Sequence, residues 1–213
     1  MTSPSQAKIV YTAANQKILQ HTTVDLNGDG VADFALNPGS GTNSGMSFRY
    51  LDAAVSRRNR LVGQSSCASA LKAGATVGPA QQLVDGEELM AAWSFNGNRY
   101  RGPWMNGGKG VTNRYLGIRF VIKGRIHYGW ARLTVTPTKN FVATLTGYAY
   151  ETIANKPIIA GKTKGPDEIA STAGQSNPAS RTASTPQPHT LGLLAVGAPG
   201  LSIWRREESH ATA

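Results

Sequence analysis

Residues 115–135 read YLGIRFVIKGRIHYGWARLTV, and this stretch decides the fold. Apolar residues alternate with others from Leu116 to Ile122, which is the period-two pattern of a half-buried strand. The Lys-Gly pair at 123–124 predicts a tight hairpin, followed by a return strand over 125–135. Near Gly129 the apolar positions move to the other face, which predicts a bulge or a strand buried on both sides. The stretch therefore predicts two antiparallel strands.

The pattern continues on both sides of this hairpin. Residues 136–140 predict a turn, and residues 141–151 a third strand of the same meander, with Tyr148 and Tyr150 alternating against small residues. A helical turn is indicated over 79–85. Earlier strands are expected over 8–12, 17–24, 32–36, 48–55 and 89–95. About eight short strands joined by Gly-rich connections predict an all-β fold, a two-sheet antiparallel β-sandwich.

The composition divides the 213-residue chain into four parts. The β-sandwich domain is expected over residues 1–161. Residues 162–188 are rich in Ser, Thr, Ala, Pro and Gly, which predicts a flexible, disordered linker. Residues 189–206 form a short apolar segment, expected as a short C-terminal helix, and residues 207–213 a polar tail. The single Cys and the absence of clustered Cys/His tracts exclude a disulfide scaffold and a structural zinc site.

The formal net charge is +10, but the cations are spread along the chain. The densest run is Arg57-Arg58-Asn59-Arg60, and no nucleic-acid-binding motif accompanies it. Because binding of nucleic acid requires a concentrated basic stripe, no nucleic-acid partner is expected. A basic protein of this kind suits an anionic exopolysaccharide instead.

Residues 25–33 read DLNGDGVAD and place side-chain oxygens at loop positions 1, 3, 5 and 9. Such spacing lets several oxygens surround one Ca²⁺ while a Gly at position 6 allows a sharp turn. The predicted ligands are the side chains of Asp25, Asn27, Asp29 and Asp33 and the carbonyl of Val31. The alternative is an Asp/Asn/Gly turn without an ion, because these are common turn residues.

The twelfth loop position holds Leu36 in place of the bidentate Glu of an EF-hand. The spacing resembles the shortened loops of dockerins, thrombospondin type 3 repeats and FG-GAP-type repeats, which implies a calcium staple in an exported β protein. Without the Glu, weak affinity is expected, about 10⁻⁴ to 10⁻³ M.

The C-terminal region consists of Pro186-Gln187-Pro188, a short apolar segment and the pair Arg205-Arg206. This arrangement resembles the PEP-CTERM sorting signal of Gram-negative bacteria, with Gln where the family usually has Glu. The stretches YLGIRFVIKGRIHYGWARLTV and LTGYAYETIANKPIIAG also look like the β-sandwich domain of many uncharacterised PEP-CTERM proteins. The resemblance implies an exosortase-type sorting enzyme as partner and transient tethering to the inner membrane. It also implies delivery to the cell surface or extracellular matrix.

The given start, MTSPSQAKIVYTAANQKI, carries no basic-then-apolar signal peptide. Because export requires one, we expect the natural start to lie further upstream.

No catalytic activity is expected. The carboxylates outside the calcium-type loop stand in no recognisable catalytic context, and no GxSxG is present. His127, between Ile126 and Tyr128, is expected to be a packing or hydrogen-bonding residue of its strand.

The stretch from Trp93 to Trp104 interleaves aromatic residues with Asn and Arg in a Gly-rich loop. Aromatic faces stack on sugar rings, and Arg or Asn side chains reach hydroxyl or acidic groups. If Trp93 and Phe95 belong to the core, the exposed candidates are Tyr100, Arg101 and Trp104.

Two functions follow from the sequence. The first is a non-catalytic, calcium-stapled, exported protein of the surface or matrix. The second is a polysaccharide-binding, lectin-like module at the same location.

Overall fold

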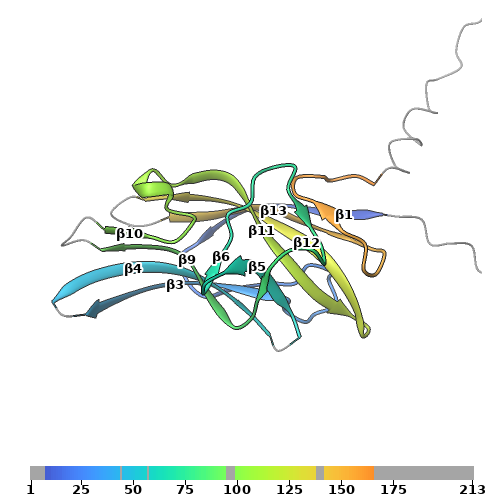
Figure 1. Ribbon diagram of the computed structural model, residues 1–213, viewed down its shortest axis with the longest axis horizontal. Coiled ribbons are helices and arrows are strands. Elements are labelled where there is room, and N and C mark those ends of the chain that lie inside the picture. The colour runs from blue at the N-terminus through green and yellow to red at the C-terminus, as the bar shows by residue number, and fades with distance from the viewer. Residues whose placement is uncertain (1–7, 44, 57, 95–98, 138–141, 166–213) are drawn as a thin grey trace, which may run out of the picture. The chain divides into compact units, whose positions relative to one another are not determined.

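In a computed structural model the chain divides into two units, residues 1–175 and 176–213, and only residues of the first are described. The structure describes residues 8–43, 45–56, 58–94, 99–137 and 142–165, all in the first unit. These residues form an all-β fold, as predicted (Figure 1). The strands are β1 Ile9–Ile18, β2 Thr22–Val24, β3 Phe34–Asn43, β4 Met46–Val55, β5 Arg60–Gln64, β6 Cys67–Ala68, β7 Thr76–Val77, β8 Leu83–Val84, β9 Glu87–Ser94, β10 Arg99–Arg101, β11 Val111–Ile122, β12 Arg125–Thr136, β13 Val142–Glu151 and β14 Ile158–Ile159.

Twelve of these strands form one large, mostly antiparallel sheet, and β7 and β14 form a small second sheet. The main path runs β1-β13-β12-β11-β5-β6-β9-β4-β3-β2, with β10 beside β9 and β8 beside β5. The predicted meander is its β11-β12-β13 part. Its hairpin turns at Lys123 and Gly124, which both have positive φ (48° and 79°) and so give the twist that a two-residue hairpin requires.

The sandwich-like layering comes from the two halves of this sheet. Inward-facing residues of β3, β4 and β9 and of β11, β12 and β13 belong to one hydrophobic cluster, the main core. The two layers are joined by hydrogen bonds, because β5 pairs with β11 on one side and with β6 on the other, and β6 pairs with β9. The sandwich therefore has a continuous connection between its layers.

Gly63 makes this connection possible. A Cβ at this position would overlap the carbonyl oxygen of Cys67 and approach Val84 Cγ2 to 2.8 Å. The close pairing of β5 with β6 therefore requires a residue without a side chain.

The middle of β12 is buried on both faces. Ala131, Leu133 and Val135 face the main core, whereas Tyr128 and Trp130 belong to a second core under β7 and β14. This confirms one of the two explanations for the change of face near Gly129. The bulge lies in β13, opposite Arg132 and Leu133. Arg132 pairs with Gly147 and Leu133 with Leu145, so Thr146 of β13 has no partner in β12.

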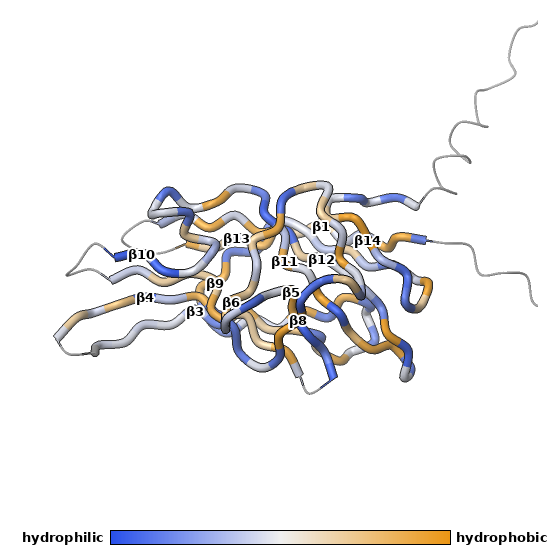
Figure 2. Tube along the Cα trace, in the orientation of Figure 1, coloured by the Kyte–Doolittle hydropathy of each residue, from blue (hydrophilic) through white to orange (hydrophobic). Residues whose placement is uncertain are grey.

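Buried and partly exposed positions alternate strictly along β13, and Figure 2 shows the hydropathy of each described residue along the chain. The predicted helical turn over 79–85 is wrong. Gln81 closes a turn by donating its backbone N–H to the carbonyl of Gly78, and Leu83–Val84 then form β8. The only helix of the described residues is the 3-10 turn Asn106–Gly108, and no helix in the described part of the chain is long and apolar enough to cross a membrane.

Candidate functional site

The outer face of β4, β9 and β10 carries a groove lined by aromatic and arginine side chains. Leu51 and Ala53 of β4 face the main core, so Phe48, Tyr50 and Asp52 point to the opposite side of the sheet. Cross-strand partners share a face, and Tyr50 pairs with Ala92 while Phe48 pairs with Ser94. The next strand adds Arg101 opposite Ala92 and Arg99 opposite Ser94. We call this surface the aromatic groove; its volume is about 930 Å³, and it is lined by Met46, Phe48, Tyr50, Asp52, Leu89, Ala92, Trp93, Ser94, Arg99, Tyr100 and Arg101.

Two glycines of β3 set the position of the aromatic rings. Gly39 pairs with Tyr50 and Gly41 with Phe48. A Cβ on either glycine would collide with the ring opposite it, so each ring lies over bare backbone. The Phe48 and Tyr50 rings are 6.0 Å apart with an interplanar angle of 35°. Both side chains are partly exposed, and they form a platform of two neighbouring rings.

The groove has cations on one strand and a carboxyl group on another. Arg99 and Arg101 are exposed on β10. On β4, burial and the nearby Glu87 raise the pKa of Asp52 to about 6. Glu87 itself accepts a hydrogen bond from Asn37 Nδ2 at 2.8 Å. Aromatic faces combined with arginine side chains can hold a sugar ring that carries an acidic group.

The structure corrects the predicted ligand-binding loop. Trp104 is fully buried, and its Nε1 donates a hydrogen bond to the carbonyl of Ala68 at 2.9 Å. The prediction that Trp104 is exposed is therefore wrong, because Trp104 and the neighbouring Met105 pack into the main core. Tyr100 is half-buried and stacks on Trp93 at 6.2 Å, while Arg101 is exposed as predicted. Phe95 lies outside the described residues.

The groove residues Phe48, Tyr50 and Asp52 were not among the predicted ligand-binding residues. A sequence signal exists for them: the three residues alternate in a predicted strand, and Gly39 and Gly41 precede them at the same spacing. What the sequence does not contain is the pairing of β4 with β9 and β10, which places arginines beside the rings.

The calcium-type loop is held together by hydrogen bonds of its own. The Asp25 carboxylate accepts backbone N–H groups of Asn27, Gly28 and Gly30, at 3.2, 2.7 and 2.7 Å. Asp29 Oδ1 accepts the N–H of Val31 at 2.9 Å. Such bonds are those of an Asx turn, which forms without an ion.

One observation favours an ion in this loop. Asn27 Oδ1 is buried and has no hydrogen-bond partner among the described residues, and an amide oxygen is a ligand that Ca²⁺ accepts. The described ranges contain no group of three or more His, Cys, Asp or Glu side chains that could hold a metal ion. An ion here would therefore use Asn27 and backbone carbonyl oxygens besides the Asp25 and Asp29 carboxylates.

Asp33 ties the end of the loop to the domain. Its Oδ2 accepts the N–H of Leu26 at 2.8 Å, and the residue is 5% exposed. Burial is the main cause that raises the pKa of Asp33 to about 6, and the charges of Asp25 and Asp29 add to it. By contrast, the hydrogen bonds from the Asn27 side chain and the Val31 N–H lower the pKa of Asp29.

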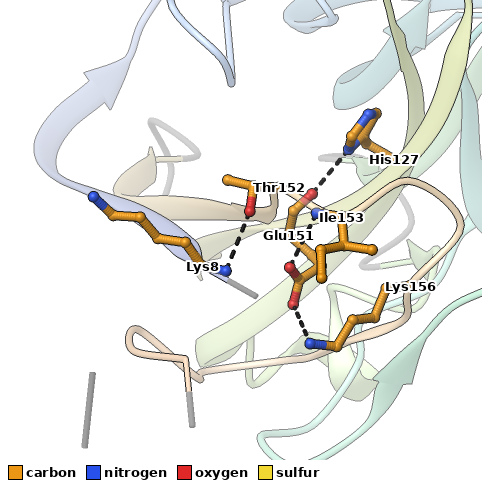
Figure 3. Close-up of polar contacts among 6 residues, drawn as sticks. All are labelled: Lys8, His127, Glu151, Thr152, Ile153 and Lys156. Carbon is orange, nitrogen blue, oxygen red and sulfur yellow. Dashed lines mark hydrogen bonds and ion pairs between the residues drawn. The ribbon is translucent and has the colours of Figure 1, made fainter. Parts of the chain in front are cut away.

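Two residues with catalytic potential have structural contacts (Figure 3). His127 is 6% exposed, and its Nδ1 donates to the carbonyl of Glu151 at 3.0 Å. The Glu151 carboxylate accepts the N–H of Ile153 at 3.1 Å and pairs with Lys156 Nζ at 3.3 Å. These contacts fix the turn after β13. His127 also borders a groove of about 860 Å³ together with Lys123, Arg125 and Tyr150.

The predicted sorting-signal residues Pro186, Gln187, Pro188, Arg205 and Arg206 lie outside the described residues, as does the predicted C-terminal helix. No protein-family model, curated protein or solved structure matches the chain.

Proposed function

We propose that the domain is a non-catalytic polysaccharide-binding module that holds an anionic sugar polymer in the aromatic groove. The observation that carries the proposal is the platform of Phe48 and Tyr50 with Arg99 and Arg101 beside it. Sugar rings stack on exposed aromatic faces, and guanidinium groups bind carboxylates through paired hydrogen bonds.

The same proposal places the module at the cell surface or in the extracellular matrix. Its support is the sequence resemblance of the C-terminal region to a PEP-CTERM signal, which would be processed by an exosortase-type enzyme. A calcium ion in the loop at residues 25–33 would stabilise the domain in that compartment, held by Asp25, Asn27, Asp29 and backbone oxygens. The net charge of +10 suits an acidic matrix polymer.

Affinity electrophoresis of the full chain through gels containing polygalacturonate or neutral dextran tests the binding. We expect the wild-type protein to be retarded by polygalacturonate. Tyr50→Ala should lose the stacking surface, and Arg101→Gln a charge-assisted contact. We expect each to weaken binding by about tenfold, the effect of about 1.4 kcal/mol.

Two control variants make the same kinds of change outside the aromatic groove. Leu19→Ala removes an apolar side chain that is 72% exposed, and Lys17→Gln removes a cation from an exposed position on β1. Both should be retarded like the wild type. The proposal is wrong if the wild type binds no acidic polysaccharide, or if Tyr50→Ala and Arg101→Gln bind as well as the controls. A purely structural matrix protein would then be the better description.

A further inference from the structure

Three arginines lie close together on the outer face of the half of the sheet that contains β11. Arg58, Arg60 and Arg119 line a groove of about 360 Å³ together with Val121, Gly124 and Ile126. We call these three residues the arginine cluster. They come from the turn before β5, from β5 itself and from β11, so segments about 60 positions apart in the sequence bring them together.

The strand register places two of these arginines directly opposite each other. Arg119 of β11 pairs with Arg60 of β5, and directly opposed residues share a face with their Cβ atoms about 5 Å apart. Like charges in this arrangement destabilise a sheet. The pair therefore costs stability unless an anion lies between the two guanidinium groups.

The guanidinium of Arg119 is also held in place. Its Nη1 donates a hydrogen bond to the carbonyl oxygen of Arg58 at 2.9 Å. This bond uses one donor of Arg119 and leaves others of its five free to bind a ligand. A fixed guanidinium loses less side-chain freedom when an anion binds.

Few negative charges compensate this surface. Arg60 Nη1 pairs with Asp85 Oδ2 at 2.9 Å, but both side chains are largely exposed, at 42% and 63%, so the pair contributes little. Among the described residues Asp85 is the only carboxylate that forms an ion pair with the cluster. The β11–β12 hairpin adds Lys123 and Arg125, both exposed, at the same end of the strands.

We propose that the arginine cluster is an oxyanion-binding site that takes a sulfate or phosphate group between Arg60 and Arg119. A tetrahedral oxyanion accepts paired hydrogen bonds from guanidinium groups. It would neutralise the two positive charges that the strand register places opposite each other. Arg58 supplies both the carbonyl that positions Arg119 and a third cation at the groove.

This site is distinct from the aromatic groove. The arginine cluster lies on β5, the turn before it and β11, whereas the aromatic groove lies on β4, β9 and β10. The oxyanion site does not rest on the proposed polysaccharide binding, and each can fail without the other.

Thermal unfolding of the full chain in low-ionic-strength buffer tests the site, with sodium sulfate added at millimolar concentration and sodium chloride at equal ionic strength as reference. At ten times the dissociation constant, sulfate should raise the wild-type Tm by roughly 3 °C more than chloride does. Arg60→Gln and Arg119→Gln should lose this difference. Without sulfate, the Tm of Arg60→Gln should be no lower than that of the wild type, because the substitution removes one of two positive charges that face each other.

Matched variants control for general salt effects. Lys17→Gln removes a cation from β1, at the far edge of the same half-sheet, and should keep the full sulfate response. Asp85→Asn removes the competing carboxylate and should strengthen sulfate binding. The proposal is overturned if sulfate acts no differently from chloride on the wild type, or if Arg60→Gln and Arg119→Gln respond like Lys17→Gln.

A second measurement avoids any effect of the substitutions on folding. Sulfate titration of the wild type, followed by NMR of the arginine Nε–H groups, should shift the signals of Arg58, Arg60 and Arg119 before those of other arginines. Uniform shifts would contradict the site.

Repeating the titration with dextran sulfate and uncharged dextran identifies the source of the oxyanion. Binding of the polymer well above that of free sulfate assigns the site to a sulfated polymer, and equal binding per sulfate group assigns it to a small ion.

Discussion

Asn59 joins the calcium-type loop to strand β11 through the backbone of Asp33. The Asn59 Nδ2 donates to the carbonyl oxygen of Asp33 at 2.9 Å, and its Oδ1 accepts the backbone N–H of Val121 at 3.2 Å. Asn59 is 6% exposed; its bond to Asp33 is buried, and its bond to Val121 is partly buried. Its chain neighbours Arg58 and Arg60 belong to the arginine cluster. One buried amide therefore positions both the loop and the cluster.

Asn59→Ala should destabilise the domain markedly. The substitution takes these partners from the buried carbonyl of Asp33 and the partly buried N–H of Val121, and an unpaired buried group costs about 1 kcal/mol or more. We expect the free energy of unfolding to fall by about 2 to 3 kcal/mol in urea denaturation. Asn15→Ala, at an exposed position of β1, should change it by less than about 0.5 kcal/mol. Similar values for the two variants would show that Asn59 does not hold the loop.

The fold was predictable where the alternation of side chains is strong. The hairpin at Lys123-Gly124 and the strand ending at Glu151 follow from local patterning and turn chemistry. The sequence does not predict strand β5, because the segment 60–64 is short and contains Gly63, which weakens the strand pattern. Its formation depends on pairing with β11, which is distant in sequence.

The candidate site was less predictable for the same reason. The aromatic stretch from Trp93 to Trp104 indicated the correct region, and Arg101 does line the aromatic groove. Which aromatic side chains face outward depends on the packing of the loop, and Trp104 proved to be part of the main core. The opposition of Arg60 and Arg119 likewise follows only from the strand register.

Millimolar Ca²⁺ should raise the Tm of the wild-type protein. With a dissociation constant of about 10⁻⁴ to 10⁻³ M, 10 mM Ca²⁺ stabilises the domain by about 1.4 to 2.7 kcal/mol, or roughly 3 to 8 °C. Asp29→Ala removes one predicted ligand and should abolish the rise. Mg²⁺ at the same concentration should have a smaller effect, because it demands near-ideal octahedral geometry. An unchanged melt of the wild type in Ca²⁺ would show that residues 25–33 are an Asx turn without an ion.

Gly63→Ala should disrupt the connection between the two halves of the sheet. The added methyl group would overlap the carbonyl oxygen of Cys67, so β5 and β6 must separate. We expect a loss of at least about 2 kcal/mol in the free energy of unfolding, the range of an overpacked site. Gly124→Asn serves as the control, because nothing lies within 4 Å of a Cβ at Gly124 and Asn tolerates its positive φ. Equal stability of Gly63→Ala and the wild type would argue against this strand pairing.

Asp52 should make both stability and ligand binding depend on pH. Its pKa is raised to about 6 from an ordinary value of 3.8, so the folded state favours the neutral carboxyl group. The stability that this group contributes is therefore full below about pH 4 and is lost as the pH rises through about 6. Because Asp52 is partly exposed, we expect Asp52→Asn to stabilise the domain at pH 7.5 by only about 1 kcal/mol.

The same titration should affect the aromatic groove. Ionised Asp52 repels an acidic polymer, so binding of polygalacturonate should strengthen severalfold as the pH falls from about 7.5 to 5, where uronate groups remain charged. Affinity electrophoresis at each pH measures this change. Asp52→Asn should bind at pH 7.5 as the wild type binds at pH 5, with a much flatter profile between. Identical pH profiles for Asp52→Asn and the wild type would show that another group titrates. Asp52 would then have no effect on the binding of the polymer.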